Sequence, residues 1–179
     1  EEFGWRQSDR IFLFVGMNFE IKGLDQILKA ISLVNHSGPP CKIRLVVVGK
    51  GNSRKYSQMA EDLSIKDDVA FTGVIESNIE RFYMGSDAFI LLSLFDTFGL
   101  VVLEAMAAGL PVVISQNVGA KDIVRDGRTG YIVDSKDISS VVHSIEQLNQ
   151  SDNLHLMRKE ALKDVQLYTW DVTAQKVSH

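Results

Sequence analysis

The chain has 179 residues, of which 45% are hydrophobic and 23% charged, a balance typical of a globular protein with a substantial core. Its net charge of -4 gives no support to a nucleic-acid partner. The single cysteine, Cys41, excludes a disulfide framework within the chain and fits a reducing compartment. No run approaches the ~18 apolar residues of a membrane span, and the polar start does not resemble a signal peptide.

Short apolar runs alternate with amphipathic segments along the chain. We predict strands at Ile11–Val15, Lys42–Gly49, Asp68–Gly73, Ala88–Ser93, Pro111–Ser115 and Thr129–Val133. We predict helical segments at Lys22–Val34, Ser53–Ser64, Ile79–Gly85, Leu100–Ala108, Lys121–Arg125 and from about Asp137 onward. Strands that are apolar on both faces and separated by helices indicate a parallel sheet covered on both sides. The sequence therefore predicts an α/β, Rossmann-like, doubly wound parallel sheet of about six strands in one domain.

In such a fold, ligands bind beyond the carboxyl ends of the strands, where this chain places three notable segments. The first is VGMNFEIKG, in which Gly16 follows a strand and Lys22 is expected to open a helix. A lysine at a helix N-terminus is unfavourable unless an anion such as a diphosphate binds there. A solvated lysine beside a turn glycine explains the same residues equally well. The loop lacks the glycine spacing of a dinucleotide-binding fingerprint, which makes dinucleotide binding less favoured.

The second segment, FDTFGLVVLEAMAAG, carries two acids in an apolar setting. Gly99 permits close backbone approach to a ligand, and the N–H groups of Gly99, Leu100 and Val101 suit phosphate oxygens. Glu104 is suited to accept hydrogen bonds from two ribose hydroxyls, and Asp96 from hydroxyls of a sugar. A helix N-cap or turn role is the alternative for Asp96, whereas the apolar sequence around Glu104 favours a functional role.

The third segment follows the strand at Asp68–Gly73. Its backbone groups are placed to read the edge of a base, with Val74 or Ile75 packed on the ring, although an ordinary loop fits equally well. The histidines form no metal or catalytic cluster, and no serine–histidine–aspartate or cysteine–histidine set is visible. The residues therefore give no sign of a histidine-based metal site or of nucleophilic catalysis by such a set.

These motifs resemble the nucleotide-sugar-binding, C-terminal half of family 4 glycosyltransferases, which have the two-domain GT-B architecture. The similarity runs through VGMNFEIKG, LVVVGKG, VAFTGVI, SDAFILLSLFDTFGLVVLEAMAAGLPVVIS and VRDGRTGYIV. The family places two glutamates with seven residues between them, where this chain has Asp96 and Glu104. Many members have an arginine after the loop glycine, where this chain has Met17. Either Lys22 must then carry more of the charge of the leaving group, or another group must help.

The resemblance implies metal-independent, retaining transfer from a nucleoside-diphosphate sugar, with a UDP-sugar favoured as the substrate and with no metal and no cofactor. It implies catalytic roles for Lys22, Asp96 and Glu104. The implied donor-binding residues are Gly16, Asn18, Lys22, Val74, Ile75, Phe98, Gly99, Leu100, Val101 and Glu104.

The resemblance also makes residues 1–179 the donor-binding domain, without the N-terminal domain that binds a glycan or lipid-linked acceptor. The isolated chain is then expected to be inactive in transfer. The loop pattern is similar to that of lipopolysaccharide-core hexosyltransferases, which suggests polysaccharide or lipopolysaccharide synthesis. A cytoplasmic location is expected, with peripheral association of the full-length protein at the inner face of the membrane. The segment Leu167–Val177 resembles one that packs back across the domain junction.

Two other functions fit the same residues. A sugar-nucleotide epimerase of GT-B architecture would alter the sugar of the donor without any acceptor. A non-catalytic module would only bind a nucleotide or glycan, and the departures at Asp96 and Met17 leave room for it. Turnover of the sugar donor by the full-length protein distinguishes these functions.

Overall fold

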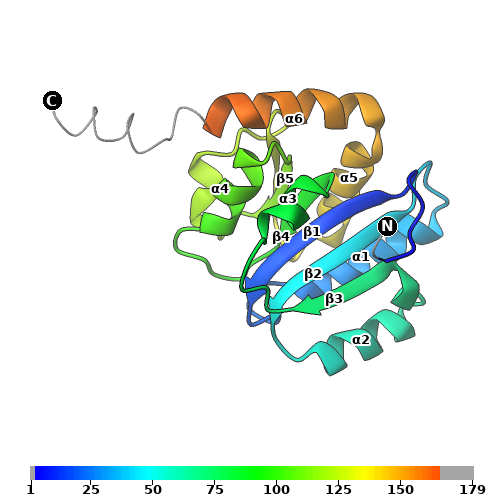
Figure 1. Ribbon diagram of the computed structural model, residues 1–179. Helices are drawn as coiled ribbons and strands as arrows, with labels where there is room; N and C mark the ends of the chain where they lie inside the picture. Colours follow the sequence, from blue (N-terminus) through cyan, green and yellow to red (C-terminus); the bar gives the residue numbers. More distant parts are fainter. Residues whose placement is uncertain (1–2, 166–179) are drawn as a thin grey trace, which may run out of the picture.

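Six parallel strands form a single sheet in the computed structural model, which describes residues 3–165 (Figure 1). The strand order is β3-β2-β1-β4-β5-β6. The strands are β1 (Arg10–Met17), β2 (Ile43–Lys50), β3 (Val69–Gly73), β4 (Ala88–Leu91), β5 (Val112–Ser115) and β6 (Gly130–Val133). The chain starts in the middle of the sheet at β1, moves outward through β2 to β3, and returns to β4 on the other side of β1. The order therefore reverses between β1 and β4, which is the point where open α/β sheets bind ligands.

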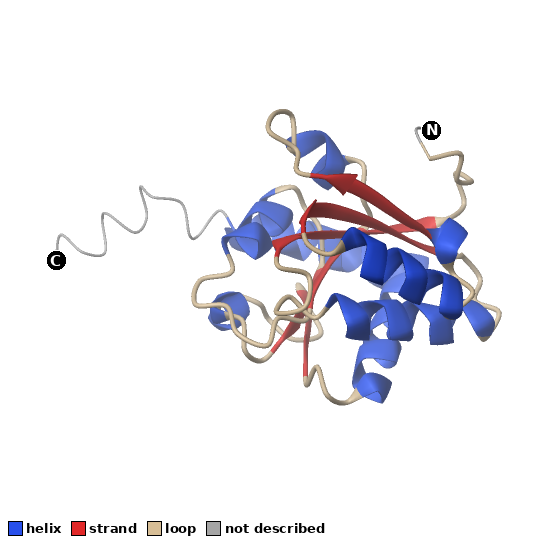
Figure 2. Ribbon diagram, turned by 90° about the horizontal axis from the view of Figure 1, so that it is seen from below, coloured by secondary structure: helices blue, strands red, loops and turns tan. Residues whose placement is uncertain are grey.

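Helices cover both faces of the sheet (Figures 1 and 2). They are α1 (Leu24–His36), α2 (Ser53–Asp62), α3 (Glu80–Met84), α4 (Leu100–Ala107), α5 (Ile138–Asn149) and α6 (Ser151–Val165), with short 3₁₀ turns at Lys66–Asp68 and Gly119–Asp122. Helix α1 packs against α2 and α5, and α6 packs against both α4 and α5. The predicted Rossmann-like, doubly wound parallel sheet of six strands is confirmed.

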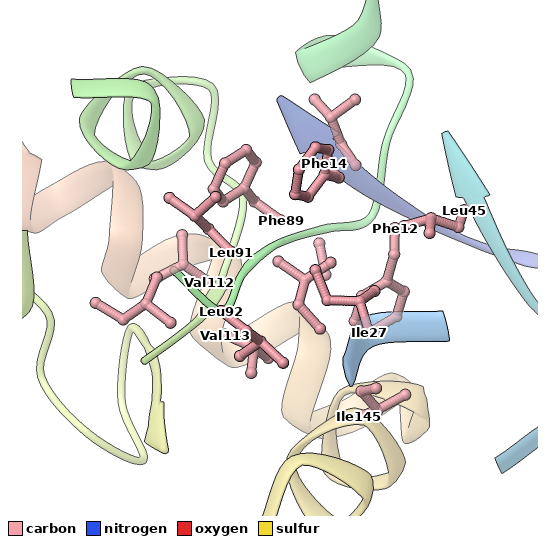
Figure 3. Close-up of a cluster of buried hydrophobic side chains, with 14 of the residues drawn as sticks. Phe12, Phe14, Ile27, Leu45, Phe89, Leu91, Leu92, Val112, Val113 and Ile145 are labelled. Atoms are coloured by element: carbon pink, nitrogen blue, oxygen red, sulfur yellow. The ribbon is translucent and has the colours of Figure 1, made fainter. Parts of the chain in front are cut away.

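The core consists of strand side chains packed against one stripe of each amphipathic helix. All four residues of β4 and all four of β5 are buried, as expected for central strands covered on both faces. Phe12 of β1 lies beside Ile27 of α1, and Ile145 of α5 lies next to that pair (Figure 3). Each of these three side chains is fully buried. Buried side chains from the strands and the helices therefore hold the central strands from both faces of the sheet.

Several element boundaries differ from those predicted by one to a few residues. The clearest case is α1, which begins at Leu24 and not at Lys22. Gly23 precedes it in the left-handed conformation, with φ of 73°, so Lys22 lies in the turn before the helix. The helix expected from Asp137 onward is two helices, α5 and α6, and the segment Leu167–Val177 lies outside the described residues.

The carboxyl ends of β1 and β2 approach each other closely through a pair of glycines. Gly16 and Gly49 are opposite each other in the parallel register. Gly49 has φ of 128°, and a Cβ atom there would lie 1.9 Å from the Gly16 carbonyl oxygen. Only glycine therefore fits at position 49, which explains why both strands run into glycine where the chain turns toward the edge of the sheet.

Replacing Gly49 with alanine is expected to destabilise the chain strongly, because the new methyl group meets backbone atoms that cannot move away. We expect a loss of at least about 3 kcal/mol in the free energy of unfolding, measured by urea denaturation. Gly127→Ala is the matched control, since Gly127 also has a positive φ but nothing lies within 4 Å of the added Cβ. It should cost only about 1–2 kcal/mol. Equal losses for the two variants would contradict the steric explanation.

Candidate functional site

A cavity of about 470 Å³ lies at the carboxyl ends of the strands, where the strand order reverses. Its walls come from the ends of β1 and β2, the segment after β3, the start of α3, and the residues that lead into α4 (Figure 1). The segments that form it are far apart in sequence and meet only because the sheet is parallel and doubly wound. A cavity therefore lies beyond the carboxyl ends of the strands, where the sequence placed the site.

Nine of the eleven predicted site residues line this cavity. They are Gly16, Lys22, Val74, Ile75, Asp96, Phe98, Gly99, Leu100 and Val101. Sequence reasoning did not assign binding roles to five other lining residues: Val15, Met17, Val48, Gly49 and Ile79. Four of these five lie at the carboxyl ends of β1 and β2, so their adjacency to Gly16 and to the glycine that ends the second predicted strand was the available signal. Asn18 and Glu104 are not among the lining residues.

Lys22 and Asp96 form an ion pair inside the cavity, with 2.5 Å between Nζ and Oδ2. The loop of Lys22 is fixed against the residues after β4, because the Leu94 N–H donates to the Ile21 carbonyl at 2.8 Å. Gly23 permits this close packing, because a Cβ atom at that position would lie 2.1 Å from the Leu92 carbonyl oxygen. The two charged groups therefore meet because the turn before α1 lies directly on the end of β4.

Asp96 also contacts the start of α4. Its Oδ1 atom accepts a hydrogen bond of 2.9 Å from the Gly99 N–H. The Asp96 backbone is held by the segment after β5, with its N–H donating to the Asn117 carbonyl and its carbonyl accepting from Gly119. The sequence left open whether Asp96 contacts a ligand or acts as a turn or capping residue. In the structure its side chain accepts from the Gly99 N–H just before α4, as a turn residue does, and it also lines the cavity.

Opposing effects act on the ionisation of Asp96. Burial favours the neutral acid, but the hydrogen bond from Lys22, the backbone N–H groups of Gly99 and Phe98, and the Lys22 charge together hold the pKa of Asp96 below its ordinary value. The carboxyl group therefore carries a full negative charge at neutral pH. The cavity thus contains one fixed cation and one fixed anion in contact.

The start of α4 presents backbone N–H groups to the cavity. Gly99 precedes the helix in the left-handed conformation, with φ of 65°, and a Cβ atom there would lie 2.6 Å from the Val118 side chain. The first N–H groups of a helix have no partner within the helix, and they carry the positive end of its dipole. Leu100 and Val101, the first two residues of α4, line the cavity. This arrangement suits an anion.

Glu104 lies one turn further along α4 and is exposed. Its Oε2 atom accepts a hydrogen bond of 2.7 Å from the hydroxyl group of Tyr83 on α3. Tyr83 is buried, and burial, the hydrogen bond to Glu104 and the Glu104 charge all raise the pKa of its phenol. The residues next to Glu104 in sequence are apolar, but Ala105 and Met106 face the core, so the Glu104 side chain lies at the exposed surface beside Tyr83. Tyr83, which fixes Glu104, was not predicted.

Asn18 shapes the first loop and lies outside the cavity lining. Its φ of 61° places it in the left-handed conformation, which asparagine tolerates better than most residues. Its backbone N–H donates to the Lys50 carbonyl and its carbonyl accepts from the Lys22 N–H, at 2.8 and 3.1 Å. Asn18 therefore supports the turn that carries Lys22 toward the cavity.

Two further observations concern the described residues as a whole. Within residues 3–165, no three histidine, cysteine, aspartate or glutamate side chains gather closely enough to hold a metal ion. Over the same range, no helix has both the length and the apolar character that crossing a membrane requires.

The lowered pKa of Asp96 predicts a specific pH dependence of stability. A carboxyl group whose pKa is lowered by folding stabilises the fold above its ordinary value of 3.8, and this contribution is lost as the pH falls through the lowered value. The wild-type chain should therefore have a higher free energy of unfolding than Asp96→Asn above about pH 4, and this difference should disappear only below that pH. Urea denaturation of both proteins over a series of pH values measures this difference. A difference that stays constant down to acid unfolding would contradict the assignment.

Comparisons with known proteins find sequence relatives and solved structures that share this fold. An uncharacterised glycosyltransferase of Methanocaldococcus jannaschii is 29% identical over 179 residues, which cover 97% of this chain and 45% of the relative. The crystal structure of WaaG, a glycosyltransferase involved in lipopolysaccharide biosynthesis, superposes with a TM-score of 0.84 at 24% identity, covering 96% of this chain and 46% of WaaG.

Two other solved structures show the same fold. The C-terminal domain of the group 1 glycosyltransferase LpcC from Francisella tularensis gives a TM-score of 0.80 at 20% identity, covering 90% of this chain and 88% of that domain. The pneumococcal O-GlcNAc transferase GtfA, in complex with UDP and GlcNAc, gives 0.78 at 20% identity, covering 97% of this chain and 37% of GtfA.

The chain spans less than half the length of the curated relatives it matches. The model of the family described as "Glycosyl transferases group 1" matches residues 1–164, which is most of the chain. The chain therefore belongs to the group 1 glycosyltransferase family.

Proposed function

We propose that the chain is the C-terminal, donor-binding domain of a retaining hexosyltransferase that takes its sugar from a nucleoside diphosphate, with UDP favoured. The observation that carries this proposal is the cavity in which Lys22, Asp96 and the N-terminus of α4 converge. Support for a domain of a larger enzyme comes from the relatives, which are more than twice as long, and from the C-terminal domain of LpcC. Support for UDP comes from the GtfA complex.

The diphosphate would lie between Lys22 and the start of α4. The ammonium group and the N–H groups of Gly99, Leu100 and Val101 supply positive charge on both sides of a space that is partly shielded from water. Gly16 carries no side chain, so the phosphates can approach the end of β1 closely. These groups provide the charge that a metal ion would otherwise supply, so we propose a site that needs neither a metal nor a cofactor.

The other parts of the sugar nucleotide have matching surfaces around the diphosphate. Val74 and Ile75 would pack on the base, and Phe98, which also lines the cavity, would lie toward the transferred sugar. Asp96 keeps lone pairs beyond the two hydrogen bonds that it accepts, so it can also accept from hydroxyl groups of the sugar. Glu104 would bind the ribose hydroxyls at the mouth of the cavity, with Tyr83 holding one of its oxygens in place.

In the transfer step, the bond between the anomeric carbon and the diphosphate breaks, and negative charge develops on the leaving group. Lys22 and the helix N-terminus stabilise that charge, which is electrostatic catalysis by groups already in position. Retention of configuration at the anomeric carbon is the stereochemical outcome that we propose. The acceptor, a glycan or a lipid-linked sugar, would bind to a preceding N-terminal domain.

We place this reaction in polysaccharide or lipopolysaccharide synthesis, at a cytoplasmic site where the full-length protein can associate peripherally with the inner face of the membrane. The support is the resemblance of the first loop to lipopolysaccharide-core enzymes and the fold shared with WaaG. An epimerase or a purely binding module would use the same cavity, so donor binding alone does not separate the three functions.

Calorimetric titration with UDP-glucose, GDP-mannose and ADP-glucose, without metal, tests donor binding. We expect saturable binding of one donor, weakened at least about tenfold by Lys22→Ala, which removes a charge-assisted contact, and by Glu104→Ala, which removes the ribose contact. Lys29→Ala is the matched control, because Lys29 lies on exposed α1 surface and pairs with Asp25. Binding that Lys22→Ala leaves unchanged would contradict the assignment.

The isolated chain should bind the sugar donor but transfer little or no sugar, because the acceptor is held elsewhere in the enzyme. Incubation of the chain and of the full-length protein with radiolabelled donor and an added acceptor measures this difference. Appreciable transfer by the isolated chain would contradict the division of roles. Conversion of the donor sugar without any acceptor would indicate an epimerase, and no turnover by the full-length protein a binding module.

A further inference from the structure

The two kinds of group that the proposed site offers to a diphosphate are already in contact with Asp96. The ammonium group of Lys22 contacts one carboxylate oxygen at 2.5 Å, and the Gly99 N–H at the start of α4 donates to the other at 2.9 Å. A phosphate group bound between the same two partners would accept the same two hydrogen bonds. The Asp96 carboxylate therefore occupies the position of an anionic ligand.

The Asp96 carboxylate cancels the positive charge that Lys22 brings to the cavity lining. Lys22 and Asp96 are the charged members of its described lining, and the other twelve residues are uncharged or apolar. Their side chains are only 22% and 15% exposed, so water screens their interaction weakly. The lining thus has no net charge, although the ligand that we propose carries at least two negative charges.

We propose that Asp96 is an internal counter-anion of the diphosphate site: it competes with the diphosphate for Lys22 and the start of α4, and thereby weakens the binding of the nucleoside diphosphate. This inference rests on the proposed function and adds to it. In the intact enzyme, the diphosphate must leave after each transfer, and Asp96 can then return to Lys22. Asp96 would therefore favour release of the product.

Replacing Asp96 with asparagine separates this role from a contact with the sugar. Asparagine keeps the size of the side chain and an oxygen that can accept from the Gly99 N–H, but removes the negative charge. UDP carries no sugar, so only the effect on the diphosphate is measured. We expect Asp96→Asn to bind UDP and inorganic pyrophosphate at least about fivefold more tightly than the wild-type chain, in calorimetric titrations at low salt.

Three comparisons make the experiment specific. Asp62→Asn removes the same charge from the exposed end of α2 and should leave the affinity for UDP unchanged. The gain in affinity for UDP from Asp96→Asn should be smaller in a Lys22→Ala background, because the cation for which Asp96 and the diphosphate compete is then absent. Raising the ionic strength should reduce the difference between wild type and Asp96→Asn. Asp96→Ser, which also retains an acceptor for Gly99, gives the same test if the asparagine variant folds poorly.

The outcomes distinguish this inference from the proposed function. Tighter binding of UDP by Asp96→Asn or Asp96→Ser, with no change for Asp62→Asn, supports both. If the wild-type chain binds UDP and both Asp96 variants bind it equally or more weakly, with a cooperative thermal unfolding transition for at least one of them, the inference is overturned and the proposed function stands. If none of the proteins binds UDP or pyrophosphate, both are overturned.

Discussion

The ion pair between Lys22 and Asp96 joins the two halves of the sheet at the point where their connections diverge. Strands β1 and β4 are neighbours, but the helix after β1 covers one face of the sheet and the helix after β4 covers the other. This divergence opens the cavity, and the ion pair bridges it at 2.5 Å. The Gly99 N–H, which is among the groups proposed to bind the diphosphate, also donates to Asp96. The ion pair is therefore joined directly to the start of α4 as well as to the turn before α1.

Rigid backbone packing determines where the ion pair lies. Gly49 and Gly23 allow backbone contacts that any side chain would prevent, so the ends of β1 and β2 and the turn before α1 have one available arrangement. The Asp96 backbone is held between Asn117 and Gly119. The polar groups are thus fixed by their backbones as well as by each other. Groups held in this way do not have to reorganise when charge develops in a reaction, which is the condition for effective electrostatic stabilisation.

Most of the fold and most of the cavity lining could be predicted from the sequence, because apolar runs that end in glycine define strands and their carboxyl ends must share one edge of the sheet. Glu104 shows where that reasoning fails. Its apolar neighbours favoured a functional role, but they did not show that Val102, Ala105 and Met106 face the core while Leu100 and Glu104 are exposed. Helix α4 is apolar on most of its surface, so periodicity could not show which way Glu104 faces. Its contact with Tyr83 depends on how α3 packs, which no local pattern encodes.

The balance of charge in the cavity limits what one lysine can do there. A cation in a partly buried site is costly without a partner, so the ligand-free fold gains from placing Asp96 against Lys22. Under the proposed function, a bound diphosphate would have to share or break the same contact, and part of the binding energy would be spent on that exchange. With Met17 and not an arginine beside Gly16, no second cation in the described lining offsets this cost. Under the proposed function, affinity for the diphosphate would therefore depend on how Lys22 and the start of α4 are shared between Asp96 and the ligand.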